Sequence, residues 1–200
     1  RIMRRVRHPN IALFYGAHIM VGDTMNLAEV EHLASDSGML TDAAMPIRIS
    51  LVLERVPGLN LYVFLSDLQE ADQHITSEAL TARSITMKQV GQALIYLHSR
   101  TPCIVHADVK PDNILVEMRG AMPFAKLLDF GLSRTVTRNS KVTGGTKNFV
   151  APEIKSGESG RAHPSADVFS FGRMLSLMAE GARLRMKLSA DEPSADGRPQ

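Results

Sequence analysis

Cysteine is almost absent from this sequence, since Cys103 is the only one among 200 residues. No disulfide can form within the chain, and a reducing, cytoplasmic compartment is the simplest inference. Long apolar runs are missing as well, because no uninterrupted stretch reaches the roughly 20 residues that cross a bilayer. The first residues, R-I-M-R-R-V-R, lack the pattern of a signal peptide. We therefore expect no membrane span in this segment, while a membrane anchor elsewhere in a longer parent chain is left open.

An excess of charge of one sign is also lacking. The chain has 23 Lys and Arg against 21 Asp and Glu, which gives a formal net charge of +2. A balance this even does not indicate a nucleic-acid-binding face, so we expect no nucleic-acid partner. Hydrophobic residues make up 44% of the chain, which is enough to build a buried core.

One short stretch, His106 to Val116, combines an acid, a cation and an amide before it turns apolar. It reads H-A-D-V-K-P-D-N-I-L-V. Pro111 disfavours a helix at the residue before it, so residues 110–113 are expected to form a loop. The branched apolar residues 114–116 suit a short buried strand. A second apolar run, 124–128, follows a turn-prone segment, and the two runs predict an antiparallel hairpin.

The predicted hairpin brings three polar side chains to one edge. Asn113 precedes the first strand, Asp129 follows the second, and Asp108 lies in the same loop. Because the start of one antiparallel strand lies beside the end of its partner, these side chains can converge. Such oxygen ligands suit Mg²⁺, which proteins usually hold with one or two carboxylates plus substrate phosphates. Gly131 is expected to take a positive φ that turns the chain away from the site. The alternative is that these residues only form turns.

Four motifs occur in a characteristic order. They are H-x-D-x-K-x-x-N over 106–113, D-F-G over 129–131, G-T-x-x-x-x-A-P-E over 145–153 and D-V-F-S-F-G over 167–172. Together they resemble the catalytic half of a eukaryotic protein kinase. The resemblance implies an α+β, two-lobe kinase fold that is truncated. Residues 1–56 would be a remnant of the β-rich small lobe, residues 57–180 the first part of the mainly helical large lobe, and residues 181–200 a disordered tail.

The resemblance also implies a reaction, the transfer of the γ-phosphoryl group of ATP to a Ser or Thr hydroxyl of a protein substrate, with ATP and Mg²⁺ as cofactors. Asp108 would orient the hydroxyl and accept its proton, and Lys110 would neutralise charge on the γ-phosphate. Asn113 and Asp129 would hold Mg²⁺.

The nucleotide base would lie against a hinge between the lobes. By the resemblance, Leu53 is the gatekeeper, Glu54 and Val56 offer backbone hydrogen bonds, Asn60 lies near the ribose, and Leu115 lies under the adenine. The alternative is an ordinary strand that ends in a Pro-Gly turn, which would give the same sequence.

Residues 132–145 are implied to be an activation segment. Its possible phosphorylation sites are Thr135, Thr137, Ser140 and Thr143. In the family, the threonine that matches Thr146 hydrogen-bonds the catalytic Asp and Lys, and Ala151, Pro152 and Glu153 match the motif that anchors this segment.

Several further residues are implied to be structural. His106 and Phe130 would stack in an internal column with Met3 and Phe14. Asp167 would accept backbone hydrogen bonds beneath the catalytic loop, which is the segment of the H-x-D-x-K-x-x-N motif over 106–113.

Hydrophobic spacing predicts the remaining elements. The stripe of Met87, Val90, Leu94 and Leu97 marks a helix over 81–99, and the helix over 166–180 is apolar on nearly every side, which predicts burial all round. The other predicted elements are the end of a helix over 1–7, strands over 11–17, 49–55 and 104–105, an extended excursion over 21–46, and a helix over 59–68.

Two features refine the resemblance. Lys110-Pro111, with H-P-N-I-A-L-F-Y-G-A over 8–17, resembles the tyrosine-kinase-like group of Ser/Thr kinases. Ala107 stands where many kinases have an Arg that pairs with a phosphorylated activation loop. The H-A-D sequence over 106–108 therefore lacks the Arg-Asp pair and is of the non-RD type. We therefore expect that activity does not depend strongly on phosphorylation of this loop.

Parts of the family pattern are missing from these 200 residues. They are the glycine-rich phosphate loop, a Lys on a small-lobe strand (the strand Lys) and a Glu on the large helix of the small lobe (the helix Glu). We therefore expect the isolated chain to be inactive, because each loss removes positioning or electrostatic stabilisation. One alternative is a pseudokinase or kinase fragment that scaffolds partners, although the four polar residues of the site are all retained. Another is a small-molecule phosphotransferase, which residues 151–153 and 167–172 disfavour because they match a peptide-substrate platform.

Overall fold

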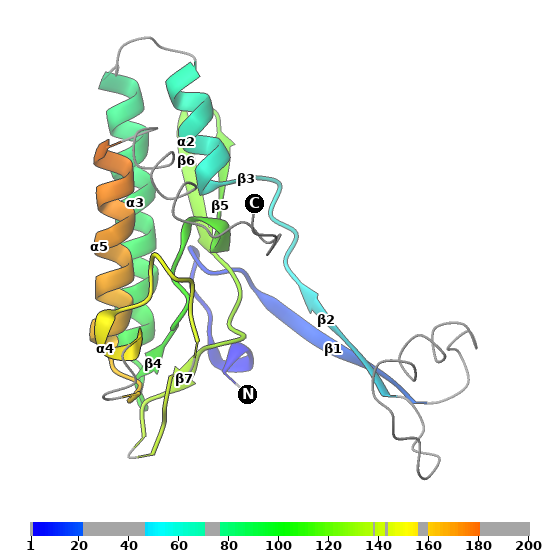
Figure 1. The fold of residues 1–200 in the computed structure, drawn as a ribbon. Coiled ribbons are helices and arrows are strands. Elements are labelled where there is room, and N and C mark those ends of the chain that lie inside the picture. Colours follow the sequence, from blue (N-terminus) through cyan, green and yellow to red (C-terminus); the bar gives the residue numbers. More distant parts are fainter. Residues whose placement is uncertain are drawn as a thin grey trace, which may run out of the picture. The chain divides into compact units, whose positions relative to one another are not determined.

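The computed structural model describes residues 2–21, 47–70, 77–137, 139–142, 144–155 and 160–180 (Figure 1). The chain divides into two compact units, residues 14–54 and residues 1–13 with 55–200, and each is described by itself. The predicted excursion falls outside the described residues except at its first residue, and the predicted tail over 181–200 falls wholly outside them. In the described part of the chain, no helix is both long and apolar enough to cross a membrane.

The smaller unit is an antiparallel hairpin of β1 (Phe14–Val21) and β2 (Ile47–Leu53), in which His18 lies opposite Ser50. The strand predicted over 49–55 is therefore present. The strand predicted over 11–17 begins later, at Phe14, because the residues before it make other bonds. Ile11 bridges to Leu127 in the larger unit instead.

The larger unit is built around α3 (Ser77–His98), whose predicted stripe is confirmed. Met87, Val90, Leu94 and Leu97 are all buried. The helix before it, α2 (Leu61–Glu70), starts two residues later than predicted. Leu59 and Asn60 form the short strand β3, and the Asn60 side chain accepts a hydrogen bond from the Val63 N–H at 2.9 Å. This N-cap fixes the start of the helix.

The predicted antiparallel hairpin is confirmed. A 3₁₀ turn, Pro111–Asn113, leads into β5 (Ile114–Arg119), which pairs with β6 (Met122–Leu127), and β3 pairs with the other side of β5. Ile114 lies opposite Leu127, so the beginning of β5 and the end of β6 are adjacent.

The outer edge of β6 is covered by groups from two other segments. The amide of Gln89, on α3, accepts the Ala125 N–H at 2.6 Å and donates to the Pro123 carbonyl at 3.0 Å. The Asn10 amide donates to the Ala125 carbonyl at 2.9 Å. Leu127 exchanges backbone hydrogen bonds with the Asn10 carbonyl and the Ala12 N–H. The covering segment, residues 10–12, includes Ile11 and Ala12 from the strand predicted over 11–17.

Two predictions about helices are wrong. In the helix end predicted over 1–7, the described residues 2–7 contain only a 3₁₀ turn, Met3–Arg5, and the Arg7 N–H donates to the Tyr96 hydroxyl instead of a helical carbonyl. The helix α5 (Pro164–Glu180) is not buried all round, since Val168 is 60% and Leu175 is 45% exposed. Among the described residues, only one side of α5 packs against α3 and β4 (Figure 1).

Short strands complete the larger unit. The predicted strand β4 (Ile104–Val105) is buried and pairs with β7 (Arg134–Thr135), which lies in the implied activation segment. A four-residue helix, α4 (Pro152–Lys155), follows that segment. Both α3 and α5 contact β4, so the chain that leaves β4 at Val105 starts from a rigid support.

Candidate active site

The centre of the site is a closed set of hydrogen bonds among three side chains. The Lys110 ammonium lies 3.0 Å from Asp108 Oδ2 and 2.8 Å from Thr146 Oγ1. The Thr146 hydroxyl donates to Asp108 Oδ1 at 3.0 Å. The Asp108 side chain is 10% exposed and that of Lys110 is 22% exposed, so both remain open to solvent. An acid, a cation and a hydroxyl from two distant segments therefore meet at one point.

The Asp108 carboxylate is held in its ionised form. Burial acts to raise the pKa of Asp108, but the hydrogen bond and the charge of Lys110, with hydrogen bonds from Thr146 and Asn113, outweigh burial and lower the pKa. A carboxylate whose pKa is lowered is a weak base near neutral pH. The Asp108 carboxylate is therefore better suited to orienting a hydroxyl than to removing a proton early in a reaction.

Asn113 joins the same cluster from the end of the 3₁₀ turn that precedes β5. Its Nδ2 donates to the Asp108 carbonyl at 2.8 Å and to Asp108 Oδ2 at 2.9 Å. Since both bonds use the nitrogen, the amide oxygen is the atom suited to bind a cation. The Asn113 carbonyl accepts the Leu128 N–H at 2.8 Å, so the backbone places Asp129 next to this edge.

The described part of the chain contains no group of three or more His, Cys, Asp or Glu side chains that could hold a metal. Asp129 offers a carboxylate and Asn113 an amide oxygen, which are ligand types that Mg²⁺ accepts beside phosphate and water oxygens. That these two residues hold Mg²⁺ stays a prediction.

The prediction for Gly131 is wrong, because the positive φ falls on Asp129 instead, at 54°. The Asp129 carboxylate curls back and accepts the Gly131 N–H at 2.9 Å. A Cβ atom on residue 131 would lie 3.1 Å from Asp129 Oδ1. Glycine accommodates this close approach, because a Cβ here would push the carboxylate away by a few tenths of an ångström, and Gly131 is not among the residues with a positive φ.

His106 is a packing residue in the structure. It is fully buried, and its ring meets that of Phe130 edge to face with the ring centroids 5.0 Å apart. Burial lowers the pKa of His106, so the ring is neutral. Its Nδ1 accepts the Asp108 N–H and its Nε2–H donates to the Leu128 carbonyl. Met3 packs against the core cluster that contains Phe130, while Phe14 lies in the smaller unit and its place in the column stays a prediction.

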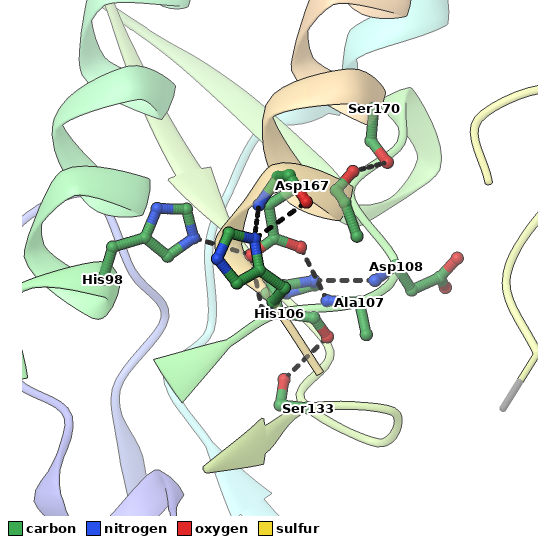
Figure 2. Close-up of polar contacts among 10 residues, drawn as sticks. His98, His106, Ala107, Asp108, Ser133, Asp167 and Ser170 are labelled. Carbon is green, nitrogen blue, oxygen red and sulfur yellow. Dashed lines mark hydrogen bonds and ion pairs between the residues drawn. The ribbon is translucent and has the colours of Figure 1, made fainter. Parts of the chain in front are cut away.

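Asp167 binds the backbone at the start of the catalytic loop. It is completely buried on α5, and its two oxygens accept the N–H groups of His106 and Ala107, each at 2.8 Å. Figure 2 shows these contacts with two partners that the sequence did not indicate. His98, on α3, donates to Asp167 Oδ2 at 2.8 Å, and Ser133 donates to the His106 carbonyl at 3.0 Å.

The segment that follows Thr146 is held by α5. The Ser170 hydroxyl donates to the Phe149 carbonyl at 2.7 Å, and Arg173 donates to the Asn148 carbonyl at 3.2 Å. Ala151 is buried, and its carbonyl accepts the first hydrogen bonds of α4, which contains Pro152 and Glu153. The predicted anchor motif therefore lies on a supported turn, while its role stays a prediction.

The residues implied to bind the nucleotide are divided between the units. Asn60 lies opposite Leu115 across the β3–β5 pair, and the Val56 carbonyl accepts the Gly58 N–H at 2.9 Å. Leu53 ends β2, and Glu54 follows it in the smaller unit. The oxygen of the Asn60 side chain is engaged as the cap of α2. A shared nucleotide site for these residues stays a prediction.

Comparison with known proteins shows the family of the chain. The family model described as the protein kinase domain matches residues 1–196, and the chain belongs to this family. Serine/threonine-protein kinase CTR1 of Arabidopsis thaliana is 32% identical over 177 residues, which cover 87% of this chain and 17% of that protein. Probable serine/threonine-protein kinase SIS8 of the same plant is 32% identical over 180 residues, covering 88% and 14%.

A more distant relative is the probable serine/threonine-protein kinase drkA of Dictyostelium discoideum, which is 28% identical over 175 residues and covers 87% of this chain and 22% of that protein. The predicted resemblance to Ser/Thr kinases of the tyrosine-kinase-like group is thereby confirmed. The chain spans 14% to 22% of the length of these three relatives.

Proposed function

We propose that this chain is the catalytic segment of an ATP-dependent protein kinase, which transfers the γ-phosphoryl group to a Ser or Thr hydroxyl of a protein. The observation that carries the proposal is the closed set of hydrogen bonds among Asp108, Lys110 and Thr146. These hydrogen bonds join the catalytic loop to the segment before α4. An acceptor peptide has to lie beside this segment if its hydroxyl is to reach Asp108.

Each residue has a chemical task in this proposal. Asp108 accepts a hydrogen bond from the substrate hydroxyl and aligns it, then receives its proton as the bond to phosphorus forms. Lys110 balances negative charge on the transferred group. Asn113 and Asp129 would hold Mg²⁺, which, when bound with ATP, neutralises charge on the phosphates.

The proposed architecture is the two-lobe kinase fold. Residues 1–56 would belong to the small lobe and residues 57–180 to the large lobe, with Leu53, Glu54 and Val56 at the hinge between them. These 200 residues contain no glycine-rich phosphate loop, strand Lys or helix Glu. We therefore assign the activity to the full-length protein and expect little from the 200 residues alone.

The proposal is tested by incubating the full-length protein with radiolabelled ATP, Mg²⁺ and a library of acceptor peptides. We expect label on peptides that carry Ser or Thr and none on peptides whose only hydroxyl is on Tyr. The absence of any Mg²⁺-dependent transfer would favour the scaffolding alternative.

Thr146 gives a first prediction. Thr146→Val removes the hydroxyl that connects Asp108 with Lys110 but keeps the side-chain volume. We expect kcat for peptide phosphorylation to fall by about 10- to 100-fold, because small errors of placement have effects of this size. Thr146→Ser is the matched variant that keeps the hydroxyl, and it should retain most of the activity. Equal kcat values for the two variants would contradict the role of the hydroxyl.

The activation segment is held in place by contacts that need no phosphate. The Val142 N–H donates to the Gly160 carbonyl at 2.6 Å, and the Ala162 N–H donates to the Ser140 carbonyl at 3.0 Å. A small apolar cluster of Val105, Val142 and Ala162 packs against Ala107, the residue that replaces the usual Arg. The described part of this segment is therefore tethered by its backbone and by apolar packing.

A second prediction follows from these contacts. Replacing Thr135, Thr137, Ser140 and Thr143 together by alanine should change kcat less than about threefold, because no charged phosphate bridge has to form. Thr143 lies outside the described residues. The measurement is peptide phosphorylation by the full-length variant, with phosphatase-treated wild type as the reference. Complete loss of activity in the variant would show that phosphorylation of this loop is required.

A further inference from the structure

One buried hydrogen bond connects the two segments that carry the candidate catalytic residues. The Ser133 hydroxyl donates to the His106 carbonyl at 3.0 Å, and Ser133 is only 4% exposed (Figure 2). Ser133 follows Asp129 along the chain, and His106 comes shortly before Asp108. The bond therefore links the segment of the candidate metal ligand directly to the catalytic loop.

The peptide unit that accepts this bond is also held at its other polar atom. Its N–H group, which belongs to Ala107, donates to Asp167 Oδ1 at 2.8 Å. Ala107 has a φ of 69°, in the left-handed region that residues with a Cβ rarely adopt. Such a backbone angle persists only where the surroundings fix it. Here the carbonyl of the 106–107 peptide is fixed by Ser133 and its N–H by Asp167.

Solvent is poorly placed to replace the serine. His106 is fully buried, and Ser133 nearly so. Removal of the hydroxyl takes this donor away from a buried carbonyl. The peptide is then held only through its N–H, so it can tilt about that remaining bond. Asp108 begins at the next peptide unit, so a rotation there changes the direction of its carboxylate.

We propose that Ser133 is a positioning residue, whose hydroxyl fixes the 106–107 peptide and thereby keeps Asp108 aligned with the segment that carries Asp129. This inference rests on the proposed function. In this role Ser133 contacts neither nucleotide nor acceptor, so its loss slows the chemical step and leaves binding of both substrates intact.

The kinetic test is Ser133→Ala in the full-length protein. We expect kcat to fall about tenfold, with the KM values for ATP and for an acceptor peptide within about twofold of wild type. Thr86→Val is the matched control, because Thr86 is fully buried and its hydroxyl, like that of Ser133, donates to a backbone carbonyl, that of Ala82 within α3, at 2.8 Å. The control should leave kcat unchanged.

Hydrogen exchange gives a readout that needs no activity. In Ser133→Ala the amides of His106 and Ala107 should exchange at least about tenfold faster, while amides in the middle of α3 do not change. If the wild type transfers no phosphate but exchange accelerates, the proposed function fails, while the fixation of the 106–107 peptide by Ser133 stands. Unchanged exchange at the two amides overturns the positioning role whether or not the wild type is active. If the wild type is active, an unchanged kcat in Ser133→Ala or an equal loss of kcat in Thr86→Val overturns it as well.

Discussion

Asp108→Asn in the full-length protein is expected to lower the rate of phosphotransfer by about 10²- to 10⁴-fold, the usual contribution of a positioned acid–base group. The Asp108 side chain accepts hydrogen bonds from Lys110, Thr146 and Asn113. Asparagine offers one acceptor oxygen and a donor NH₂ group, so at least one of these donors would face another donor. The variant loses both the negative charge that balances Lys110 and the atom that receives the proton.

The matched control for this prediction is Asp112→Asn, which makes the same chemical change at an exposed residue of the same loop. Initial rates at saturating ATP and peptide should be close to wild type for Asp112→Asn and close to background for Asp108→Asn. Binding of the nucleotide, measured separately, should be similar in the two variants because Asp108 acts on the acceptor. A fully active Asp108→Asn variant would remove the basis of the proposed function.

Asp167→Asn is expected to have the largest effect on stability. The carboxylate accepts the buried His106 N–H, the partly buried Ala107 N–H and the N–H of the His98 ring. Asparagine keeps one acceptor oxygen, so one of these donors loses its partner, and the new NH₂ group faces that donor and has no acceptor. Two donors without partners, at about 1–3 kcal/mol each, should lower the free energy of unfolding by about 2–6 kcal/mol.

The measurement is hydrogen exchange of amides in β4 and α5 as a function of urea concentration, which reports the unfolding free energy of these elements. Asp67→Asn is the control, because Asp67 is exposed on α2 and the same substitution there removes no buried contact. We expect a change within about 0.5 kcal/mol for the control. A loss smaller than about 1 kcal/mol for Asp167→Asn would show that its hydrogen bonds are readily replaced.

Elements with a strong local pattern were predictable from the sequence. The stripe on α3 and the β5–β6 hairpin are set by the spacing of apolar residues and by turn-forming residues between them. The central side chains Asp108, Lys110, Asn113 and Thr146 were found through their motifs, and the structure brings all four together.

The partners that were missed depend on contacts between distant parts of the chain. Ser133 reaches His106 across 27 residues, and His98 reaches Asp167 across 69. A lone Ser or His in a sequence carries no sign of such a partner. The start of β1 was misplaced for a related reason. Ile11 lies in a run of residues typical of a strand, but it bridges to Leu127 on β6 and does not belong to β1.

The covered edge of β6 has a consequence for the behaviour of the protein in concentrated solution. A bare outer strand is a template onto which another molecule can add a strand, which starts aggregation. On β6, the outward carbonyls of Pro123, Ala125 and Leu127 and the outward N–H groups of the last two are all engaged. Proline has no N–H to offer. This side of the three-stranded sheet is therefore closed to intermolecular strand addition.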